Sequence, residues 1–148
     1  MAADPDKMTD PAAVRRLLAN AERLENPEVV AACQRRLYEL GGQDIEDPVE
    51  RRLWQAVTAY EETLRQKHGK TQQASYTRRK IAAKGAIVTL SDWAIDPKPT
   101  PGFAALVAAG MARFTGEYVV VEFRDRFAPE VVEAAIQKLR ALEVVLPE

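Results

Sequence analysis

Three short sequences in the first third of the chain pair a helix-capping residue with a proline, and they constrain the fold more than any other feature. They are Asp10-Pro11, Asn26-Pro27 and Asp47-Pro48. An Asp or Asn side chain accepts hydrogen bonds from the free N–H groups at the start of a helix, and proline is well tolerated at the first helical position. The sequence therefore predicts that a helix begins at each of these prolines.

The residues after each start are apolar at intervals of three and four, which is the spacing of one helical face. The second predicted helix stops at Gly41-Gly42, and the third runs to about His68, before Gly69. Glycine often ends a helix because it adopts the left-handed conformation without strain. We therefore predict that the N-terminal half is entirely helical.

Glycines and prolines divide the second half of the chain. A fourth helix is predicted over residues 72–84, and Gly85 separates it from a fifth helix. The three prolines of residues 96–102 predict a loop, which a short helix follows over residues 103–109. The last helix is predicted to begin at Pro129.

Residues 117–123 are compatible with two structures. The run Tyr118 to Val121 is rich in β-branched and aromatic residues, which favour a strand. No second strand is available to pair with it, and Thr115 can cap a helix. We favour the helix and keep a short strand as the alternative.

Length and composition predict one globular domain, since the chain has 148 residues, of which 47% are hydrophobic and 29% charged. Residues 1–9 show no core-facing period and are expected to form a flexible tail. We predict an all-α fold of about seven helices in a single compact domain over residues 10–148. The helices around the turn 69–71 form a helix-turn-helix candidate, at about residues 48–84.

The single cysteine, Cys33, excludes an intramolecular disulfide. The longest apolar runs, such as residues 103–109, are far shorter than the ~20 residues that cross a bilayer. A cytoplasmic protein without a transmembrane helix is expected.

The 29 residues from Thr63 to Ser91 contain no carboxylate side chain. The chain as a whole has a formal charge of −1, so a segment of charge +7 leaves −8 for the other residues. A basic surface on an acidic body is typical of anion binding, and nucleic acid is the commonest polyanion. The basic residues are Arg65, Lys67, Lys70, Arg78, Arg79, Lys80 and Lys84.

A period of 100° per residue divides the predicted helix 72–84 into two faces. The inward face holds Ala74, Thr77 and Ile81, with Arg78 at its border. The outward face holds Gln72, Tyr76, Arg79 and Ala83, with Ser75 and Lys80 on its flanks. Arg and Gln read base edges, whereas Ser, Tyr and Lys bind phosphate. Phosphate contacts are expected from Arg65, Lys67, Lys70 and Lys84. With about five such contacts, the logarithm of the binding constant should fall with the logarithm of the salt concentration at a slope near −4 to −5.

This pattern predicts a non-enzymatic nucleic-acid-binding protein, with DNA favoured over RNA. Two alternatives stay open: the basic face could dock an acidic protein partner, or it could be only a solvated surface. A dimer would suit a helix-turn-helix protein that reads two half-sites, but no apolar stripe identifies an interface. The oligomeric state is therefore left open.

Few residues suggest catalysis. His68 is the sole histidine and Cys33 occupies an apolar helical face, so neither a metal site nor a nucleophile–base pair is expected. Asp96 followed by Glu122 and Arg124 is a faint pattern of a metal-dependent nuclease, which we keep as a third possibility. We expect no cofactor. Trp54 and Trp93 lie at core-facing helical positions and are predicted to pack rather than to stack on bases.

Several short motifs occur in order along the chain: Ala74-Ser75-Tyr76-Thr77-Arg78, the Gly-Phe-x-x-Leu sequence of Gly102 to Leu106, and the Phe-Thr-x-Glu step of Phe114 to Glu117. Together with the Tyr60 helix, this order resembles an uncharacterised helical module of bacterial hypothetical proteins. The resemblance covers about residues 47–142. It implies a helical fold without a known catalytic residue, in a module that occurs beside nucleases and restriction-type proteins.

Overall fold

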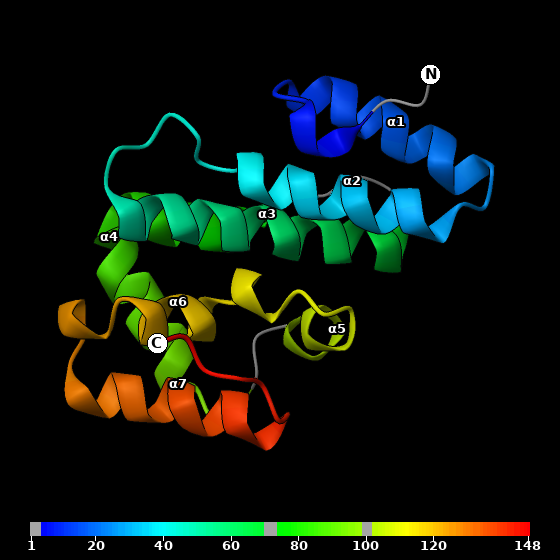
Figure 1. Cartoon of the computed structure of the whole chain (residues 1–148). Coiled ribbons are helices and arrows are strands. Elements are labelled where there is room, and N and C mark those ends of the chain that lie inside the picture. Colours follow the sequence, from blue (N-terminus) through cyan, green and yellow to red (C-terminus); the bar gives the residue numbers. More distant parts are fainter. Residues whose placement is uncertain (1–3, 70–73, 99–101) are drawn as a thin grey trace.

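The computed structural model describes residues 4–69, 74–98 and 102–148, and all of its regular structure is helical (Figure 1). The α-helices are α1 (Pro11–Arg23), α2 (Pro27–Leu40), α3 (Pro48–His68), α4 (Ser75–Ile95), α5 (Phe103–Ala108), α6 (Gly116–Glu122) and α7 (Pro129–Ala141). Three short 3-10 helices, η1 (Pro5–Lys7), η2 (Ala112–Phe114) and η3 (Arg124–Arg126), join them. The predicted all-α domain is confirmed. None of the described helices combines the length and hydrophobicity that a membrane span needs.

The three predicted helix starts are confirmed in position and in mechanism. The carboxylates of Asp10 and Asp47 accept the N–H of the second residue of α1 and α3 at 3.0 and 3.2 Å, and the Asn26 side chain accepts that of the third residue of α2 at 3.4 Å. Gly69 ends α3 in the left-handed conformation, with φ 77° and ψ 4°. The N-terminal half is therefore determined largely by contacts within a few residues.

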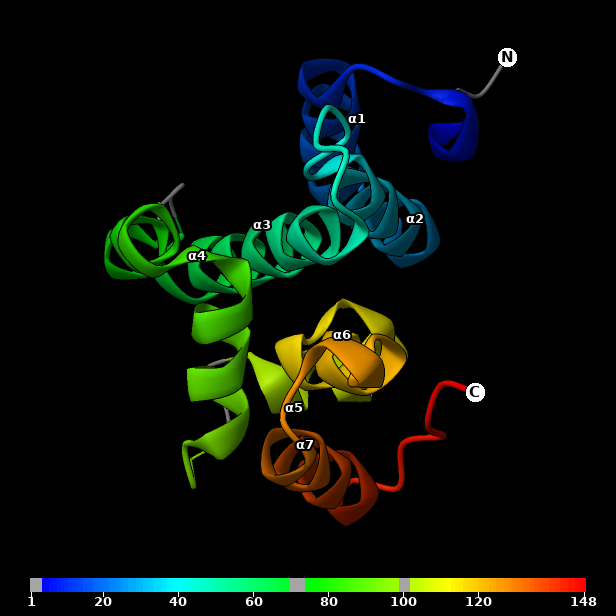
Figure 2. The same ribbon diagram turned by 90° about the vertical axis from the view of Figure 1, so that its left-hand side faces the viewer.

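The helices form three layers, which are visible from two sides (Figures 1 and 2). Helix α1 packs on α2, which packs on one side of α3, whereas α5, α6 and α7 lie on the opposite side of α3. Two groups of buried side chains fill the spaces between the layers. Helix α3 contributes to both groups, with Leu53 and Val57 in one and Ala59 in the other. It is the central element of the fold.

Helix α4 is bent at Gly85, where the sequence predicts a break between two helices. Gly85 has φ 85° and ψ 173°, a conformation that is essentially restricted to glycine. The first half of α4 lies along α3, and the second half turns away toward α6 and α7 (Figure 2). Side-by-side packing is typical of a helical hairpin, whereas the two helices of a helix-turn-helix cross at about 90–120°. The helix-turn-helix prediction gains no support from this arrangement.

Residues 116–122 form α6, so the favoured helix is confirmed and the alternative strand is wrong. The Thr115 hydroxyl accepts the Tyr118 N–H at 3.2 Å and caps the helix. The β-branched residues Val119, Val120 and Val121 are all fully buried. A helix satisfies its backbone hydrogen bonds internally, so this apolar segment needs no partner strand.

Residues 4–8 differ from the flexible tail expected there. Asp4 caps η1, and Pro5 is buried against the rest of the protein. The Arg36 Nε–H of α2 donates to the Met8 carbonyl at 2.8 Å. This packing has no periodic signal in the sequence, because it involves a single buried proline and one arginine from α2.

Candidate functional site

The first half of α4 has the two faces that its sequence predicts. Ala74, Thr77 and Ile81 are buried. On the opposite side Tyr76 is 73% exposed, and Ser75, Arg79 and Ala83 are exposed as well. We refer to Ser75, Tyr76, Arg79, Ala83 and Lys84 as the α4 face. Gln72 and Lys70, which were also predicted to contact nucleic acid, lie outside the described residues.

Arg78, at the border between these faces, joins α4 to α3. Its guanidinium donates two hydrogen bonds to the Glu61 carboxylate, both at 2.7 Å, and lies 5.2 Å from the Trp54 ring centroid. Glu61 also accepts the Ala74 backbone N–H at 2.7 Å, which fixes the start of α4. The hydrogen bonds with Glu61 raise the pKa of Arg78 above its ordinary value. Arg78 is therefore engaged within the fold.

Arg65, one of the predicted phosphate contacts, is also engaged. Its guanidinium binds both oxygens of Glu62, at 2.7 and 2.8 Å, and donates to Glu22 of α1 at 2.9 Å. Gln34 of α2 donates to the same Glu62 at 3.2 Å. The Glu62 hydrogen bonds raise the pKa of Arg65 further above its ordinary value. These contacts connect α1, α2 and α3, and the phosphate contact predicted for Arg65 stays a prediction that would compete with them.

Lys80 is the third basic residue with an acidic partner. Its ammonium lies 2.7 Å from the Asp92 carboxylate, and its side chain is only 17% exposed. The hydrogen bond from Lys80 lowers the pKa of Asp92 below its ordinary value of 3.8. The bend at Gly85 separates the two partners along the chain, so this ion pair connects the two halves of α4. Lys80 was predicted to contact nucleic acid directly; this stays a prediction, and such a contact would compete with Asp92 for the ammonium group.

Three predicted basic residues form no hydrogen bond or ion pair with an acidic side chain among the residues that the structure describes, although the charge of Lys84 helps to lower the pKa of Asp92. Arg79 and Lys84 are exposed on α4, and Lys67 is exposed in the last turn of α3. The sequence missed the pairing of the others because their partners, Glu22, Glu61, Glu62 and Asp92, all lie outside the acid-free stretch. Of these pairs, only Arg65 and Glu62 had a local signal, since residues three apart are neighbours on a helix.

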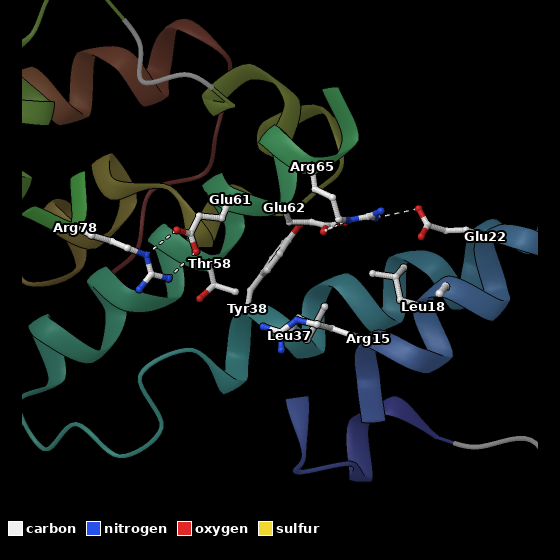
Figure 3. Close-up of a pocket in the computed structure, with 11 residues that line it drawn as sticks. Arg15, Leu18, Glu22, Leu37, Tyr38, Thr58, Glu61, Glu62, Arg65 and Arg78 are labelled. Atoms are coloured by element: carbon white, nitrogen blue, oxygen red, sulfur yellow. Dashed lines mark hydrogen bonds and ion pairs between the residues drawn. The ribbon is translucent and has the colours of Figure 1, made fainter. Parts of the chain in front are cut away.

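A charged cavity of about 370 Å³ lies between α1, α2, α3 and the start of α4 (Figure 3). Glu61 and Glu62 face it from α3, and the Tyr38 side chain points toward Glu62. Burial, and next the Glu62 carboxylate, raise the pKa of the Tyr38 hydroxyl, so the phenol stays protonated. Three arginines, Arg15, Arg65 and Arg78, also line the cavity and balance the charge of Glu22, Glu61 and Glu62. The arrangement is suited to holding the N-terminal helices on α3.

A larger cleft of about 690 Å³ begins beside the α4 face. Tyr76 and Lys80 of α4 line it together with Tyr60 of α3. Trp93 from the second half of α4 also lines the cleft. Both Trp93 and Trp54 pack against the core, as the sequence predicts. Further lining comes from Thr77, Asp92, Ile95, Asp96, Pro97, Lys98, Phe103, Leu106, Phe114, Thr115 and Gly116, and from Ala56 of α3.

The residues considered for catalysis are spread over the fold. Cys33 is fully buried, and burial raises the pKa of its thiol, which matches a core residue. Glu122 is bound by Arg52 of α3 at 3.0 Å, and no strand occurs in the described ranges to carry the nuclease pattern. Within the same ranges, no group of three or more His, Cys, Asp or Glu side chains is arranged to hold a metal ion.

Comparisons with known proteins give no relative from which a function could be inferred. No protein-family model, no curated protein and no solved structure matches this chain.

Proposed function

We propose that the protein binds nucleic acid, with DNA as the expected form, through the α4 face. The observation that carries this proposal is the pair Tyr76 and Arg79, which lie one turn apart on an exposed helical surface. Arg79 has no acidic partner among the described residues, so its guanidinium is available to a phosphate or a base edge. Lys84, also on the α4 face, and Lys67, in the last turn of α3, are exposed and add positive charge.

Arg65 and Lys80 are each paired with carboxylates, so fewer cations are free to contact phosphate and the affinity should depend less on salt. With three available cations, each neutralising one phosphate, the log–log slope is about −2.7 for a duplex and about −2 for a single strand. Lys70, outside the described residues, would add at most one more contact. We therefore expect the protein to bind nucleic acid weakly, with an affinity that depends less on salt than seven basic residues would suggest.

The test is the substitution Arg79→Gln, which removes one charge and leaves the buried side of α4 unchanged. We expect binding to labelled DNA at low ionic strength, measured by fluorescence anisotropy, to weaken about tenfold, as for one lost charge-assisted hydrogen bond. Arg140→Gln is the matched control, since Arg140 is an exposed arginine in the last turn of α7. If both variants lose the same affinity, net charge alone would explain the effect, and the proposal would be contradicted.

A second candidate, docking of an acidic protein partner, rests on the same two side chains, since Tyr and Arg are enriched among the residues that dominate protein interfaces. The two functions separate in a pull-down with the full chain. A partner that is retained after nuclease treatment and lost on Arg79→Gln would favour protein docking. A cytoplasmic location is part of either proposal, because the only cysteine is a free thiol.

A further inference from the structure

The cleft next to the α4 face combines aromatic walls with a charged rim. Tyr60 and Trp93 supply flat aromatic surface, and Tyr76 belongs both to the cleft and to the α4 face. Asp96 and Lys98 lie on the rim. A volume of about 690 Å³ falls in the range of ~300–1,000 Å³ that is usual for small-molecule sites. A ligand of this cleft should therefore be flat, with polar groups at its edge.

The cleft is continuous with the surface proposed to bind phosphates. Tyr76 and Lys80 lie within the same two turns of α4 as Arg79, and the bend at Gly85 brings Asp92 and Trp93 to the cleft from the second half of the helix. A strand whose phosphates contact Arg79 would carry its bases toward the mouth of this cleft. Nucleobases have flat faces that stack on aromatic side chains and polar edges that accept or donate hydrogen bonds.

We propose that the cleft accepts one unstacked base of a single-stranded nucleic acid whose backbone lies on the α4 face. This inference rests on the proposed function and specifies its substrate. A base within a duplex would first have to leave its stack and its pairing partner, which lowers the affinity, whereas a base of a single strand pays little of this cost. The protein therefore binds single strands in preference to duplexes.

The rim also predicts which bases enter. Asp96 uses one carboxylate oxygen to accept the Lys98 backbone N–H at 3.0 Å, and no hydrogen bond from the described residues reaches its second oxygen, which can accept from a ligand. Carboxylates accept hydrogen bonds from exocyclic amino groups such as that of cytosine. Thymine has no such amino group. Oligo(dC) is therefore expected to bind about fivefold more tightly than oligo(dT), and Asp96→Ala to remove this difference.

Trp93 provides a direct reporter of base entry. The chain has two tryptophans, so Trp54→Phe leaves Trp93 as the sole indole. Titration with oligo(dC) is expected to quench Trp93 fluorescence, a matching duplex to quench it much less, and dCMP to quench it at millimolar concentration. If Trp54→Phe does not fold, the indole N–H signals in the NMR spectrum of the unaltered chain replace fluorescence, and only the Trp93 signal should shift.

The anisotropy and Trp93 measurements together separate this inference from the proposed function. Arg79-dependent binding of oligonucleotides without any change at Trp93 would overturn the base-accepting cleft and leave the α4 face as a binding surface. A response of Trp93 to dCMP without oligonucleotide binding would leave the cleft as a site for a free nucleotide and overturn both the proposed function and the strand on the α4 face. No response in either measurement would overturn both. Equal affinity for duplex and single strand would also contradict the inference.

Discussion

The α4 face and the group formed by Glu22, Gln34, Glu62 and Arg65, here called the Arg65 cluster, use similar side chains to different ends. In the Arg65 cluster, the carboxylate of Glu62 is only 8% exposed and accepts three hydrogen bonds from Arg65 and Gln34. On the α4 face, Arg79 is exposed and has no acidic partner among the described residues. Neighbouring carboxylates, and not the number of basic residues, therefore determine which cations are free to meet a ligand.

The two regions also differ in the expected cost of losing a charge. A buried carboxylate without its cationic partner retains its desolvation penalty, whereas an exposed arginine is replaced at little cost by water. Substitutions in the Arg65 cluster should therefore act on folding, and substitutions on the α4 face should act on binding.

The largest effect is expected from Arg65→Met. It leaves Glu62 buried with the Gln34 amide alone, and we expect the free energy of unfolding to fall by about 3 kcal/mol. Urea denaturation followed by circular dichroism measures this change. Arg79→Met is the matched control and should alter stability by less than about 0.5 kcal/mol. If the two variants lose the same stability, the distinction between the regions does not hold.

An intermediate effect is expected from Gly85→Ala, which tests the bend that brings Lys80 to Asp92. An added Cβ meets no atom within 4 Å, so any loss comes from the backbone conformation alone. Because φ 85° with ψ 173° is essentially restricted to glycine, we expect a loss of about 2–3 kcal/mol.

Gly69→Ala is the control for this effect, since Gly69 is equally uncrowded and has left-handed angles of φ 77° and ψ 4°. Its expected loss of stability is about 1 kcal/mol. Thermal unfolding of the two variants gives the comparison. A loss in Gly85→Ala no larger than that in Gly69→Ala would mean that the bend carries no special backbone cost.

The smallest effect on stability is expected from Asp92→Asn, which moves Lys80 from the paired to the available cations. Asp92 is half exposed, so the loss of stability should stay below about 1 kcal/mol. Binding should improve slightly, and the salt slope should steepen by about 0.7 for a single strand or 0.9 for a duplex. An unchanged slope would show that Lys80 does not reach the ligand even when it is unpaired.

The same ion pair has a defined pH dependence. The pKa of Asp92 in the folded protein lies below its ordinary value of 3.8, because Lys80 stabilises the carboxylate. The contribution of the pair to stability is therefore complete above about pH 4 and is lost as the pH falls through the folded-state pKa. At neutral pH the pair is intact, so a substitution is needed to break it.

Much of the fold could be predicted from the sequence because its signals are local. The Asp10, Asn26 and Asp47 caps each involve a hydrogen bond to a residue two or three positions away. The same holds for Thr115, whose cap favours a helix over the strand that the adjacent valines suggest. The break at Gly85 follows from the conformational freedom of glycine. Such signals do not depend on how the helices later pack.

The candidate site could be predicted only in part. Helical periodicity correctly placed Ala74, Thr77 and Ile81 inside and Tyr76 and Arg79 outside. The charge count, however, treated all seven basic residues as equally available. The pairs of Arg78 with Glu61 and of Arg65 with Glu22 join residues 17 and 43 positions apart, and no local pattern predicts such pairs. The cleft beside α4 also draws its lining from distant helices.

The starts of α1, α2 and α3 and the side of α4 that faces the interior could be read from the sequence, because they depend on caps and on the helical period. The start of α4 at Ser75, three residues after the predicted start, has no side-chain cap to mark it. Which cations have acidic partners, and where the cleft lies, depends on the tertiary structure. Helix packing brings acidic residues from outside the acid-free stretch against Arg65, Arg78 and Lys80. The physical reason is that an ion pair depends on distance in space, and the fold sets that distance independently of separation along the chain.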